Sequence, residues 1–355
     1  FAREQRLLEP FAAGLSHATV VRYLDGNLDT EPRYIALEYL PGEPLSAAFR
    51  TGTLGSSVRR RLITDLAETL DFLHRNGVVY LDVRPENVIV RRSGRPALLD
   101  FNAAVERDER VKSVFEPDQF RAPELLPGRE TGPEAVGPPA DVFSWGKLAF
   151  YLLTGAKVET TDVPAGGVDP REFGSTCSHA FATVVRQATV PDVGERYTDG
   201  TELAAAVARA TDRGPRLVLE HPSGVRCAVA DGDTLGRLAA DEPVPWAVLA
   251  DPDGHVAPRH AWFRHSQEAW GLVDTSHNGT YVAGPDGWAL ALSEAGYRTQ
   301  RERGAIDPGR SQPPAAVALP DGAVIAPVHP EYGIRLRVTE PEGERDSSGA
   351  TNPEQ

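Results

Sequence analysis

Residues Tyr80–Val90 read Tyr-Leu-Asp-Val-Arg-Pro-Glu-Asn-Val-Ile-Val, and residues Leu98–Asn102 read Leu-Leu-Asp-Phe-Asn. Each stretch joins a short apolar run, which predicts a β-strand, to polar side chains in an adjoining loop. A carboxylate can orient a hydroxyl group and accept its proton, and carboxylate and amide oxygens bind Mg²⁺. The pattern therefore predicts a site for phosphoryl transfer from ATP, in which Asp82 activates the acceptor hydroxyl while Asn87 and Asp100 hold Mg²⁺ on the phosphates.

Both stretches resemble the catalytic loop, His-Arg-Asp-Leu-Lys-Pro-Glu-Asn, and the metal motif, Asp-Phe-Gly, of the protein kinase family. Residues Ala122–Glu124 match the Ala-Pro-Glu element of that family, Arg196 stands where the family has the Arg that pairs with this Glu, and Asp141 begins its Asp-x-x-x-Trp-Gly pattern. The resemblance implies that Glu124, Asp141 and Arg196 stabilise the domain. Small-molecule phosphotransferases, a less favoured alternative, share the Asp…Asn loop but lack these later elements.

The beginning of the chain resembles the second half of a kinase N-lobe. Phe1–Glu4 resembles the helix whose Glu pairs with the ATP-contacting Lys, and the resemblance assigns that role to Glu4. A hinge is expected near residues 38–42, with Glu38 and Leu40 beside ATP. The family's glycine-rich loop and Lys would precede Phe1, and the chain contains no Met. We therefore interpret the chain as a fragment that lacks the start of its N-lobe, is itself inactive or weak, and belongs to a parent that uses ATP and Mg²⁺.

Two substitutions bear on regulation by phosphorylation. Tyr80 and Leu81 replace the His-Arg that precedes the catalytic Asp in the family, and a leucine cannot pair with a phosphate on the activation loop. Between Asn102 and Arg121 the chain has a single hydroxyl residue, Ser113. We expect a kinase that is not switched by phosphorylation of this loop.

Other substitutions bear on catalysis itself. Pro117 replaces the activation-segment Thr of the family, Arg84 replaces the catalytic-loop Lys with retained charge, and Asn102 ends the metal motif in place of Gly. Because all three predicted chemical side chains are present, we favour a serine/threonine kinase. The alternative is a pseudokinase that binds phosphoproteins as an adaptor without catalysis, and Pro117, Leu81 and Tyr80 favour it.

A second constellation lies in the C-terminal part. Leu235–Arg237, Ala257–His260 and Asp274–Val282 follow one another in the order of the Gly-Arg, Ser-Arg-x-His and Ser-x-Asn-Gly-Thr elements of the forkhead-associated (FHA) domain, and they resemble them. This resemblance implies an all-β sandwich that binds phosphothreonine peptides. Arg237 would contact the phosphate, and Asn278 would bind the peptide backbone.

The same resemblance places Ser276 at the phosphopeptide-binding loop and His260 as its brace. Ala257 replaces the Ser that donates to the phosphate in the family, which removes a hydrogen bond worth about 1.5–3 kcal/mol. An FHA scaffold that binds a partner without phosphate therefore remains an open alternative.

The change from helical periodicity to short strand-like runs along the sequence predicts a multidomain chain. Residues 1–212 form an α+β, protein-kinase-like fold with a partial N-lobe and a mainly helical C-lobe, in which Arg59–Asn76 is an amphipathic helix. Residues 213–339 form the all-β FHA domain, with residues 293–314 as an insertion loop. The acidic tail, residues 340–355, is expected to be disordered.

Bulk composition limits the partners. The net charge of −14 disfavours nucleic acid, and no run of about 18 apolar residues predicts a membrane segment. Cys177 and Cys227 fall in different predicted domains, so neither a disulfide nor a zinc site follows from them. We expect a cytoplasmic protein whose partners are protein substrates and phosphothreonine-containing proteins.

Overall fold

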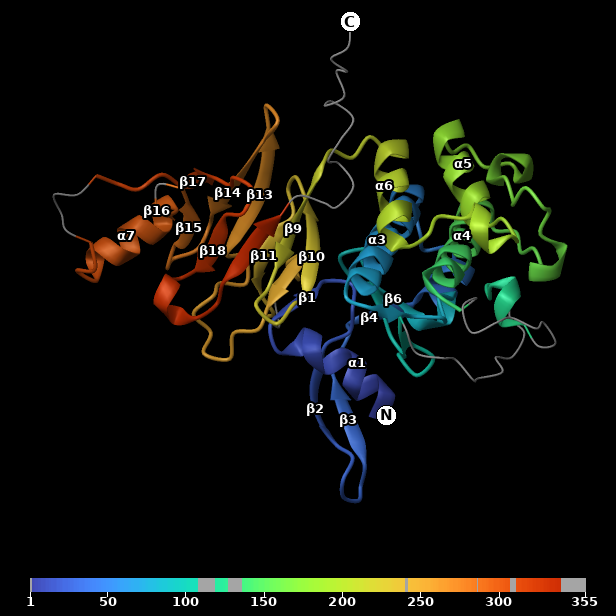
Figure 1. Cartoon of the computed structure of the whole chain (residues 1–355), viewed down its shortest axis with the longest axis horizontal. Coiled ribbons are helices and arrows are strands. Elements are labelled where there is room, and N and C mark those ends of the chain that lie inside the picture. The colour runs from blue at the N-terminus through green and yellow to red at the C-terminus, as the bar shows by residue number, and fades with distance from the viewer. Residues whose placement is uncertain are drawn as a thin grey trace, which may run out of the picture. The chain divides into compact units, whose positions relative to one another are not determined.

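A computed structural model describes residues 2–107, 119–126, 136–239, 242–285, 287–306 and 311–339 (Figure 1). Ser113, Pro117 and the tail from residue 340 lie outside the described residues. The chain divides into two units after residue 213, next to the predicted boundary at 212.

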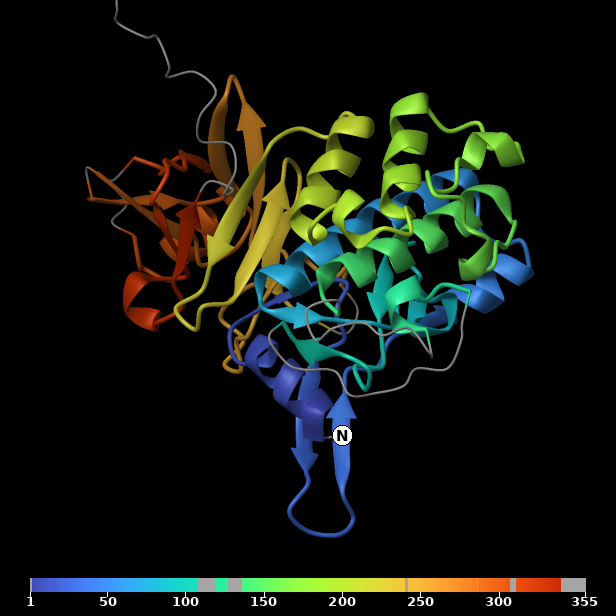
Figure 2. The same cartoon turned by 45° about the vertical axis from the view of Figure 1, so that its right-hand side comes forward.

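The first unit begins with helix α1 (Ala2–Ala12) and strand β1 (Leu15–His17). Leu7, Leu8 and Phe11 form the buried face of α1 at helical spacing. Strands β2 (Tyr23–Asn27) and β3 (Tyr34–Leu37) then pair antiparallel in a hairpin that contacts α1 through β2 and extends away from the later helices of this unit in two views (Figure 2).

Helix α3 (Ser56–Arg75) is the centre of the first unit and corresponds to the helix expected at Arg59–Asn76. Its apolar positions, including Leu66 and Leu70, are buried against α4 and α6. The helix ends before Gly77, which has a left-handed φ of 74° that favours glycine.

The rest of the first unit mixes helices with short strands. The expectation of a mainly helical C-lobe therefore holds only in the coarser form of a mixed α/β domain. Strands β4, β6 and β7 form one sheet in that order, and β5 pairs with β8. The elements are β4 (Gly42–Pro44), α2 (Leu45–Arg50), β5 (Val78–Val79), η1 (Pro85–Asn87), β6 (Val88–Arg91), β7 (Pro96–Leu98), β8 (Val105–Glu106), η2 (Pro123–Leu125), α4 (Pro138–Thr154), η3 (Thr160–Asp162), η4 (Pro170–Phe173), α5 (His179–Ala188), η5 (Val193–Glu195) and α6 (Gly200–Ala210).

The second unit consists of short strands in two sheets. One sheet has the order β10-β9-β19-β18-β15-β16 and is antiparallel throughout, and the other contains β12-β11-β13-β14-β17, with β11 and β12 parallel. The strands are β9 (Arg216–Glu220), β10 (Arg226–Ala230), β11 (Thr234–Arg237), β12 (Ala247–Leu249), β13 (Ala261–Ser266), β14 (Ala269–Asp274), β15 (Thr280–Gly284), β16 (Gly287–Ala291), β17 (Ala316–Ala318), β18 (Val324–Pro327) and β19 (Leu336–Thr339), with a single 3-10 turn, η6 (Pro330–Tyr332), between the last two.

The segment predicted to be an insertion loop, residues 293–314, begins with a helix that the sequence analysis did not predict. Helix α7 (Glu294–Glu302) starts at Ser293, whose hydroxyl oxygen caps it by accepting the N–H of Gly296 at 3.0 Å. The polar composition concealed the helix, because all but one of the α7 residues lie at the surface or half-buried.

Within the described part of the chain, no helix is both long enough and apolar enough to cross a membrane. Cys177 and Cys227 are both free thiols.

Candidate active site

Asp141 organises the backbone that immediately precedes Asp82. The fully buried Asp141 carboxylate accepts the N–H of Tyr80 at 2.7 Å and the N–H of Leu81 at 2.6 Å. It also lies 2.9 Å from Nε2 of His74. Since a buried N–H that loses its acceptor costs about 1–3 kcal/mol, this carboxylate strongly stabilises the loop.

His74 extends the same network to a third helix. Its Nδ1 accepts the N–H of Gly200 at 2.7 Å, so this nitrogen carries no hydrogen, and Nε2 is the nitrogen that donates to Asp141. A Cβ on Gly200 would come within 3.0 Å of the Leu70 backbone. Only glycine therefore lets α6 approach α3 closely enough for this hydrogen bond.

Tyr80 joins the predicted catalytic loop to the predicted metal motif. Its hydroxyl donates to the carbonyl of Leu99, and its ring meets the ring of Phe101 edge-on, with centroids 5.1 Å apart. Burial raises the pKa of Tyr80 well above its usual value, and nearby carboxylates, Asp82 first, add to the rise. The hydroxyl therefore stays protonated and remains a donor. The sequence analysis identified Tyr80 only as a replacement for His.

Asp82 is held through both carboxylate oxygens. Oδ2 accepts from Nδ2 of Asn87 at 2.6 Å, and Oδ1 accepts from Arg121 at 2.8 Å. The backbone N–H of Leu99 donates to the carbonyl of Asn87 at 2.9 Å, which brings the strand end before Asp100 next to the loop. The structure thus brings the predicted loop residues and the metal motif together.

Arg84 has a different partner from the one that its predicted role requires. Its Nε donates to Glu86 at 3.0 Å, and both side chains are partly exposed. The cation that contacts Asp82 is instead Arg121, which sequence reasoning recorded without assigning a role. Its position directly before the Ala122–Glu124 element was the only available signal.

Asp100 occupies a strained backbone position. Its φ of 55° lies in the left-handed region, as does the φ of 64° at Leu81. Such positions cost about 1–3 kcal/mol and occur mainly where surrounding contacts enforce them. Asp100 Oδ1 accepts from the backbone N–H and the side-chain amide of Asn102, at 3.1 Å and 2.7 Å.

The donor atoms that remain at Asn87 and Asp100 suit Mg²⁺. The Asn87 amide nitrogen faces Asp82, so its amide oxygen is available as a ligand. Oδ2 of Asp100 accepts no hydrogen bond from the described residues. Mg²⁺ is commonly held by one or two protein oxygens together with substrate phosphates, so two such ligands fit it. The described residues contain no cluster of three or more His, Cys, Asp or Glu side chains suited to a metal.

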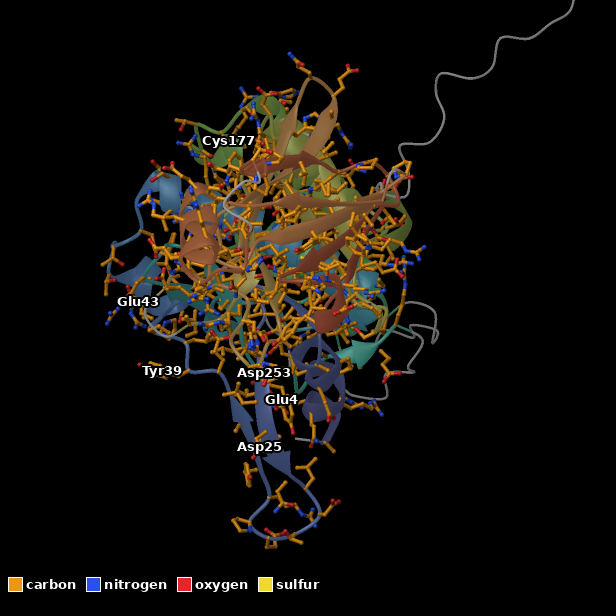
Figure 3. All side chains as sticks on the ribbon, turned by 90° about the vertical axis from the view of Figure 1, so that its left-hand side faces the viewer. Glu4, Asp25, Tyr39, Glu43, Cys177 and Asp253 are labelled. Atoms are coloured by element: carbon orange, nitrogen blue, oxygen red, sulfur yellow. The ribbon has the colours of Figure 1, made fainter. Side chains whose placement is uncertain are left out.

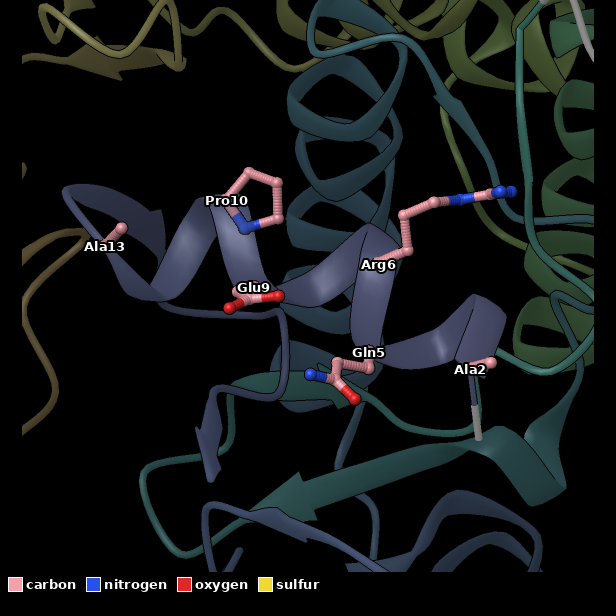
Figure 4. Close-up of a pocket in the computed structure, with 6 residues that line it drawn as sticks. All are labelled: Ala2, Gln5, Arg6, Glu9, Pro10 and Ala13. Carbon is pink, nitrogen blue, oxygen red and sulfur yellow. The ribbon is translucent and has the colours of Figure 1, made fainter. Parts of the chain in front are cut away.

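Glu4 is buried on the inner face of α1. It accepts the N–H of Phe101 at 3.4 Å, and burial, followed by the charge of Asp100, raises its pKa. Figure 3 labels Glu4 together with Tyr39, whose side chain extends away from the ribbon. A shallow groove on α1 does not include Glu4 (Figure 4); it is lined by Ala2, Gln5, Arg6, Glu9, Pro10 and Ala13.

At the predicted hinge, Glu38 has partners within the protein. Its N–H donates to the carbonyl of Arg22 at 2.8 Å, and its carboxylate pairs with the buried Arg91 at 2.9 Å. Leu40 is buried, whereas Tyr39 is 85% exposed. The Glu38 side chain therefore anchors this segment to strand β6.

Glu124 and Arg196 form a buried pair with two parallel hydrogen bonds, at 2.7 Å and 3.0 Å. The guanidinium also donates to the carbonyls of Val190, Pro139 and Pro191. A forked ion pair with this many additional acceptors satisfies the buried charge.

Residues 2–165 match the model of the protein kinase domain. The chain is 27% identical over 285 residues to the Serine/threonine-protein kinase C of Synechocystis sp., covering 78% of this chain and 51% of that protein. It is 24% identical over 258 residues to the Serine/threonine-protein kinase PknB of Mycolicibacterium smegmatis, covering 66% and 40%. It is 30% identical over 192 residues to the Serine/threonine-protein kinase pkn2 of Myxococcus xanthus, covering 51% and 21%.

These matches support a protein serine/threonine kinase. The chain spans about half the length of the first of these relatives. Asp82, Asn87 and Asp100 all lie inside the matched kinase region, and Arg121 and Glu124 do as well.

A pocket of about 420 Å³ adjoins the catalytic-loop segment of the kinase region. Phe49 and Tyr151 form one wall, with ring centroids 4.4 Å apart, and Phe120 meets Tyr151 edge-on at 5.8 Å. Pro85 and Glu86 of the loop also line it. The pocket therefore lies beside the loop that carries Asp82.

In the second unit, His260 is a buried brace. Its Nδ1 accepts the N–H of Ala257 at 3.0 Å, and its Nε2 donates to the carbonyl of Gly279 at 3.0 Å. Burial lowers the pKa of His260 to about 4. The neutral ring thus ties together two of the loops that the sequence analysis singled out.

Ser276 differs from the expectation that it contacts a peptide. It is 1% exposed, and its hydroxyl donates to Asp274 at 2.9 Å while accepting the N–H of Gly279 at 2.8 Å. The Ser276 hydroxyl is therefore used within the turn that contains Asn278. Because the side chain is buried, it is not open to a ligand.

Arg237 and Asn278 are both half-buried. The Asn278 amide donates to the carbonyl of His255 at 2.8 Å. One terminal nitrogen of Arg237 donates to the carbonyl of Leu238 at 3.0 Å, and its buried Nε has no hydrogen-bond partner among the residues that the structure describes. A buried N–H without an acceptor is rare in folded proteins and calls for an explanation, of which a bound water or ion is one.

Proposed function

We propose that the full-length protein carrying this chain transfers the γ-phosphate of ATP to serine or threonine hydroxyls of other proteins. The observation that carries the proposal is the 2.6 Å hydrogen bond between Asp82 and Asn87, with the Asn87 carbonyl bonded to Leu99 at the start of the metal motif. The kinase match over residues 2–165 adds to it. Asp82 has one role, to orient the acceptor hydroxyl and take its proton.

Mg²⁺ would be held by the Asn87 amide oxygen and the Asp100 carboxylate, and when bound it would neutralise charge on the phosphates. The other roles belong to the chain itself. Asp141 holds the loop backbone, and Glu4 holds the backbone of Phe101. The resemblance assigns ATP contacts to Glu4, Glu38 and Leu40 as well, and these stay proposals.

The test is transfer of radiolabelled phosphate from ATP to protein by the full-length protein with Mg²⁺. We expect transfer by the wild type and its near-complete loss in Asp82→Asn, which keeps the size but cannot accept the proton. If the wild type binds nucleotide without transferring phosphate, the proposal fails and the pseudokinase adaptor takes its place.

We further propose that residues 213–339 recruit phosphothreonine-containing proteins, in the manner of an FHA domain. What supports this is the half-buried Arg237, whose Nε has no hydrogen-bond partner among the described residues, together with the half-buried Asn278 beside the exposed His277. Recruitment would raise the effective concentration of a substrate near the kinase site. A cytoplasmic location belongs to the same proposal.

Binding of phosphothreonine peptides to the whole chain, by calorimetry, tests recruitment. We expect the phosphorylated peptide to bind at least about tenfold tighter than the plain one, and Arg237→Ala to abolish the difference, because one charge-assisted bond is worth about 1.5–3 kcal/mol. Equal binding of both peptides would favour a scaffold that recognises its partner without phosphate.

A further inference from the structure

The position of Arg121 sets it apart from the other cations near the catalytic loop. Its guanidinium lies 2.8 Å from Oδ1 of Asp82, and its side chain is only 9% exposed, against 20% for Asp82. Most charged pairs at protein surfaces are weak, whereas a partly desolvated pair with a hydrogen bond is considerably stronger. The Asp82–Arg121 pair belongs to the second kind.

The backbone on both sides of Arg121 is anchored. The Thr160 hydroxyl, itself buried, donates to the carbonyl of Arg121 at 2.8 Å. Three residues later, Glu124 is locked by Arg196 through two hydrogen bonds. The backbone that carries Arg121, residues 119–126, is therefore held in place, and this fixes where the guanidinium contacts Asp82.

Arg84, the cation that sequence reasoning assigned to the reaction, is held elsewhere. Its Nε donates to Glu86, and this pair is 31% and 50% exposed. Arg84 belongs to the same loop as Asp82, whereas Arg121 belongs to residues 119–126. Through Arg121, the orientation of Asp82 therefore depends on the conformation of residues 119–126.

We propose that Arg121 is a positioning residue: it holds Oδ1 of Asp82 while Asn87 holds Oδ2, so that the carboxylate faces the acceptor hydroxyl in one orientation. This inference rests on the proposed kinase function. A carboxylate oxygen can accept more than one hydrogen bond, so both oxygens can still accept from a substrate hydroxyl. Without Arg121, the carboxylate would rotate about its Cα–Cβ and Cβ–Cγ bonds.

The kinetic test uses the full-length protein with Arg121→Ala, Arg121→Lys and a matched control, Arg186→Ala, on the exposed face of α5. We expect Arg121→Ala to lower kcat by about 10- to 100-fold with the KM for ATP changed less than about twofold, since misplacement of a reacting group costs rate and not nucleotide affinity. Arg121→Lys should recover part of the rate, because it restores the charge without the fork. The control should match the wild type.

An unchanged kcat in Arg121→Ala would overturn the proposal. A raised kcat would overturn it too, because it would show that the ion pair with Arg121 inhibits Asp82. A second measurement needs no catalysis: a double-mutant cycle of Asp82→Ala and Arg121→Ala, read as shifts of the urea denaturation midpoint. We expect the double variant to shift by clearly less than the sum of the single shifts. Additive shifts would overturn the pairing.

The two readouts separate the possible failures. If the wild type transfers no phosphate, the proposed function fails, and the positioning role fails with it even if the cycle shows coupling. If the wild type is active and the shifts are additive, the proposed function stands and only the inference about Arg121 fails.

Discussion

The two units of this protein use the same device to hold the loop that carries their predicted functional residue. In the first unit, buried Asp141 and His74 hold the backbone before Asp82. In the second, buried Asp274 and His260 hold the turn that contains Asn278. Both histidines use one ring nitrogen to accept a backbone N–H and the other to donate.

The devices differ in how far along the chain they reach. Asp141 takes its donors from residues 60 to 67 positions away, on α3 and in the loop directly before Asp82. Asp274 takes its donors from Ser276, Thr280 and Ser293, which follow it by 2 to 19 positions. The first loop is therefore fixed by the tertiary packing of several elements, whereas the second is fixed largely by residues close to it in sequence.

The largest expected effect is the loss of stability when Asp141 is removed, which should exceed the loss when Asp274 is removed. Asp141→Ala should destabilise the first unit by about 3–5 kcal/mol, because a buried charged partner is lost and rigid backbone N–H groups are stranded. Asp274→Ala should destabilise the second unit by about 2–3 kcal/mol, because two of its four donors are hydroxyls that can rotate to other acceptors. Urea denaturation, monitored by hydrogen exchange in each unit separately, measures both losses of stability. Equal losses, or a larger loss for Asp274→Ala, would contradict the comparison.

The second prediction concerns pH and His260. Its pKa is lowered from 6.5 to about 4 in the folded chain, by burial first, against smaller opposing effects of the Gly279 carbonyl and the Asp251 charge. The unfolded chain binds the proton at higher pH than the folded chain does. The contribution of His260 to stability is therefore fully present above pH 6.5 and is lost as the pH falls towards 4, up to about 3 kcal/mol.

The measurement is the free energy of unfolding of wild type and His260→Gln between pH 7 and pH 4. The difference between the two proteins should shrink as the pH falls, since glutamine does not titrate. A difference that stays constant over this range would show that His260 is not held neutral.

The third prediction concerns two glycines where the backbone comes close to another segment. A Cβ on Gly200 would press on the Leu70 backbone, and a Cβ on Gly236 would press on the Pro258 carbonyl. Each Gly→Ala change should cost about 1–3 kcal/mol, because backbone must move. Gly166→Ala, at an exposed turn position with open space at its Cβ, is the matched control and should change stability by less than about 0.5 kcal/mol.

If the first device depends on tertiary packing, Gly200→Ala should also lower phosphate transfer, because it displaces His74 from Gly200. Gly236→Ala should leave transfer unchanged. Loss of transfer in both variants would argue against two independent devices.

The smallest expected effect concerns helix α7. Gln300 donates to the carbonyls of His277 and Asn278, at 3.2 Å and 3.0 Å. Gln300→Ala should destabilise the second unit by only about 1 kcal/mol, because both bonds are partly exposed. Hydrogen exchange should rise locally in residues 276–279. Faster exchange across the whole unit would mean that α7 supports more than this turn.

Several features of the fold followed from local patterns. The apolar spacing in residues 59–76 predicted a helix, and α3 is found there. The resemblance to the kinase motifs assigned Asp82, Asn87 and Asp100 to one site, and in the structure Asn87 is hydrogen-bonded to Asp82 and to Leu99, the residue before Asp100. Such features are readable because helical periodicity and tight loops depend on residues that are near in sequence.

Other features could not be read in this way. Arg121 lies 39 residues from Asp82, and its role emerges only when the chain brings them together. Helix α7 was hidden because its polar surface carries no apolar stripe. Ser276 matched a peptide-binding pattern, yet burial turns its hydroxyl inward to Asp274.

By itself, the sequence determined which chemical groups are available: carboxylates and amides for the proposed phosphoryl transfer in the first unit, and a guanidinium and an amide for the proposed peptide recognition in the second. The tertiary structure alone decided which of two arginines holds Asp82, which carboxylates are buried as supports, and which nitrogen of each histidine carries its hydrogen. The physical reason is that residue type sets what a group can do, whereas burial and hydrogen-bond partners from distant segments set what it does.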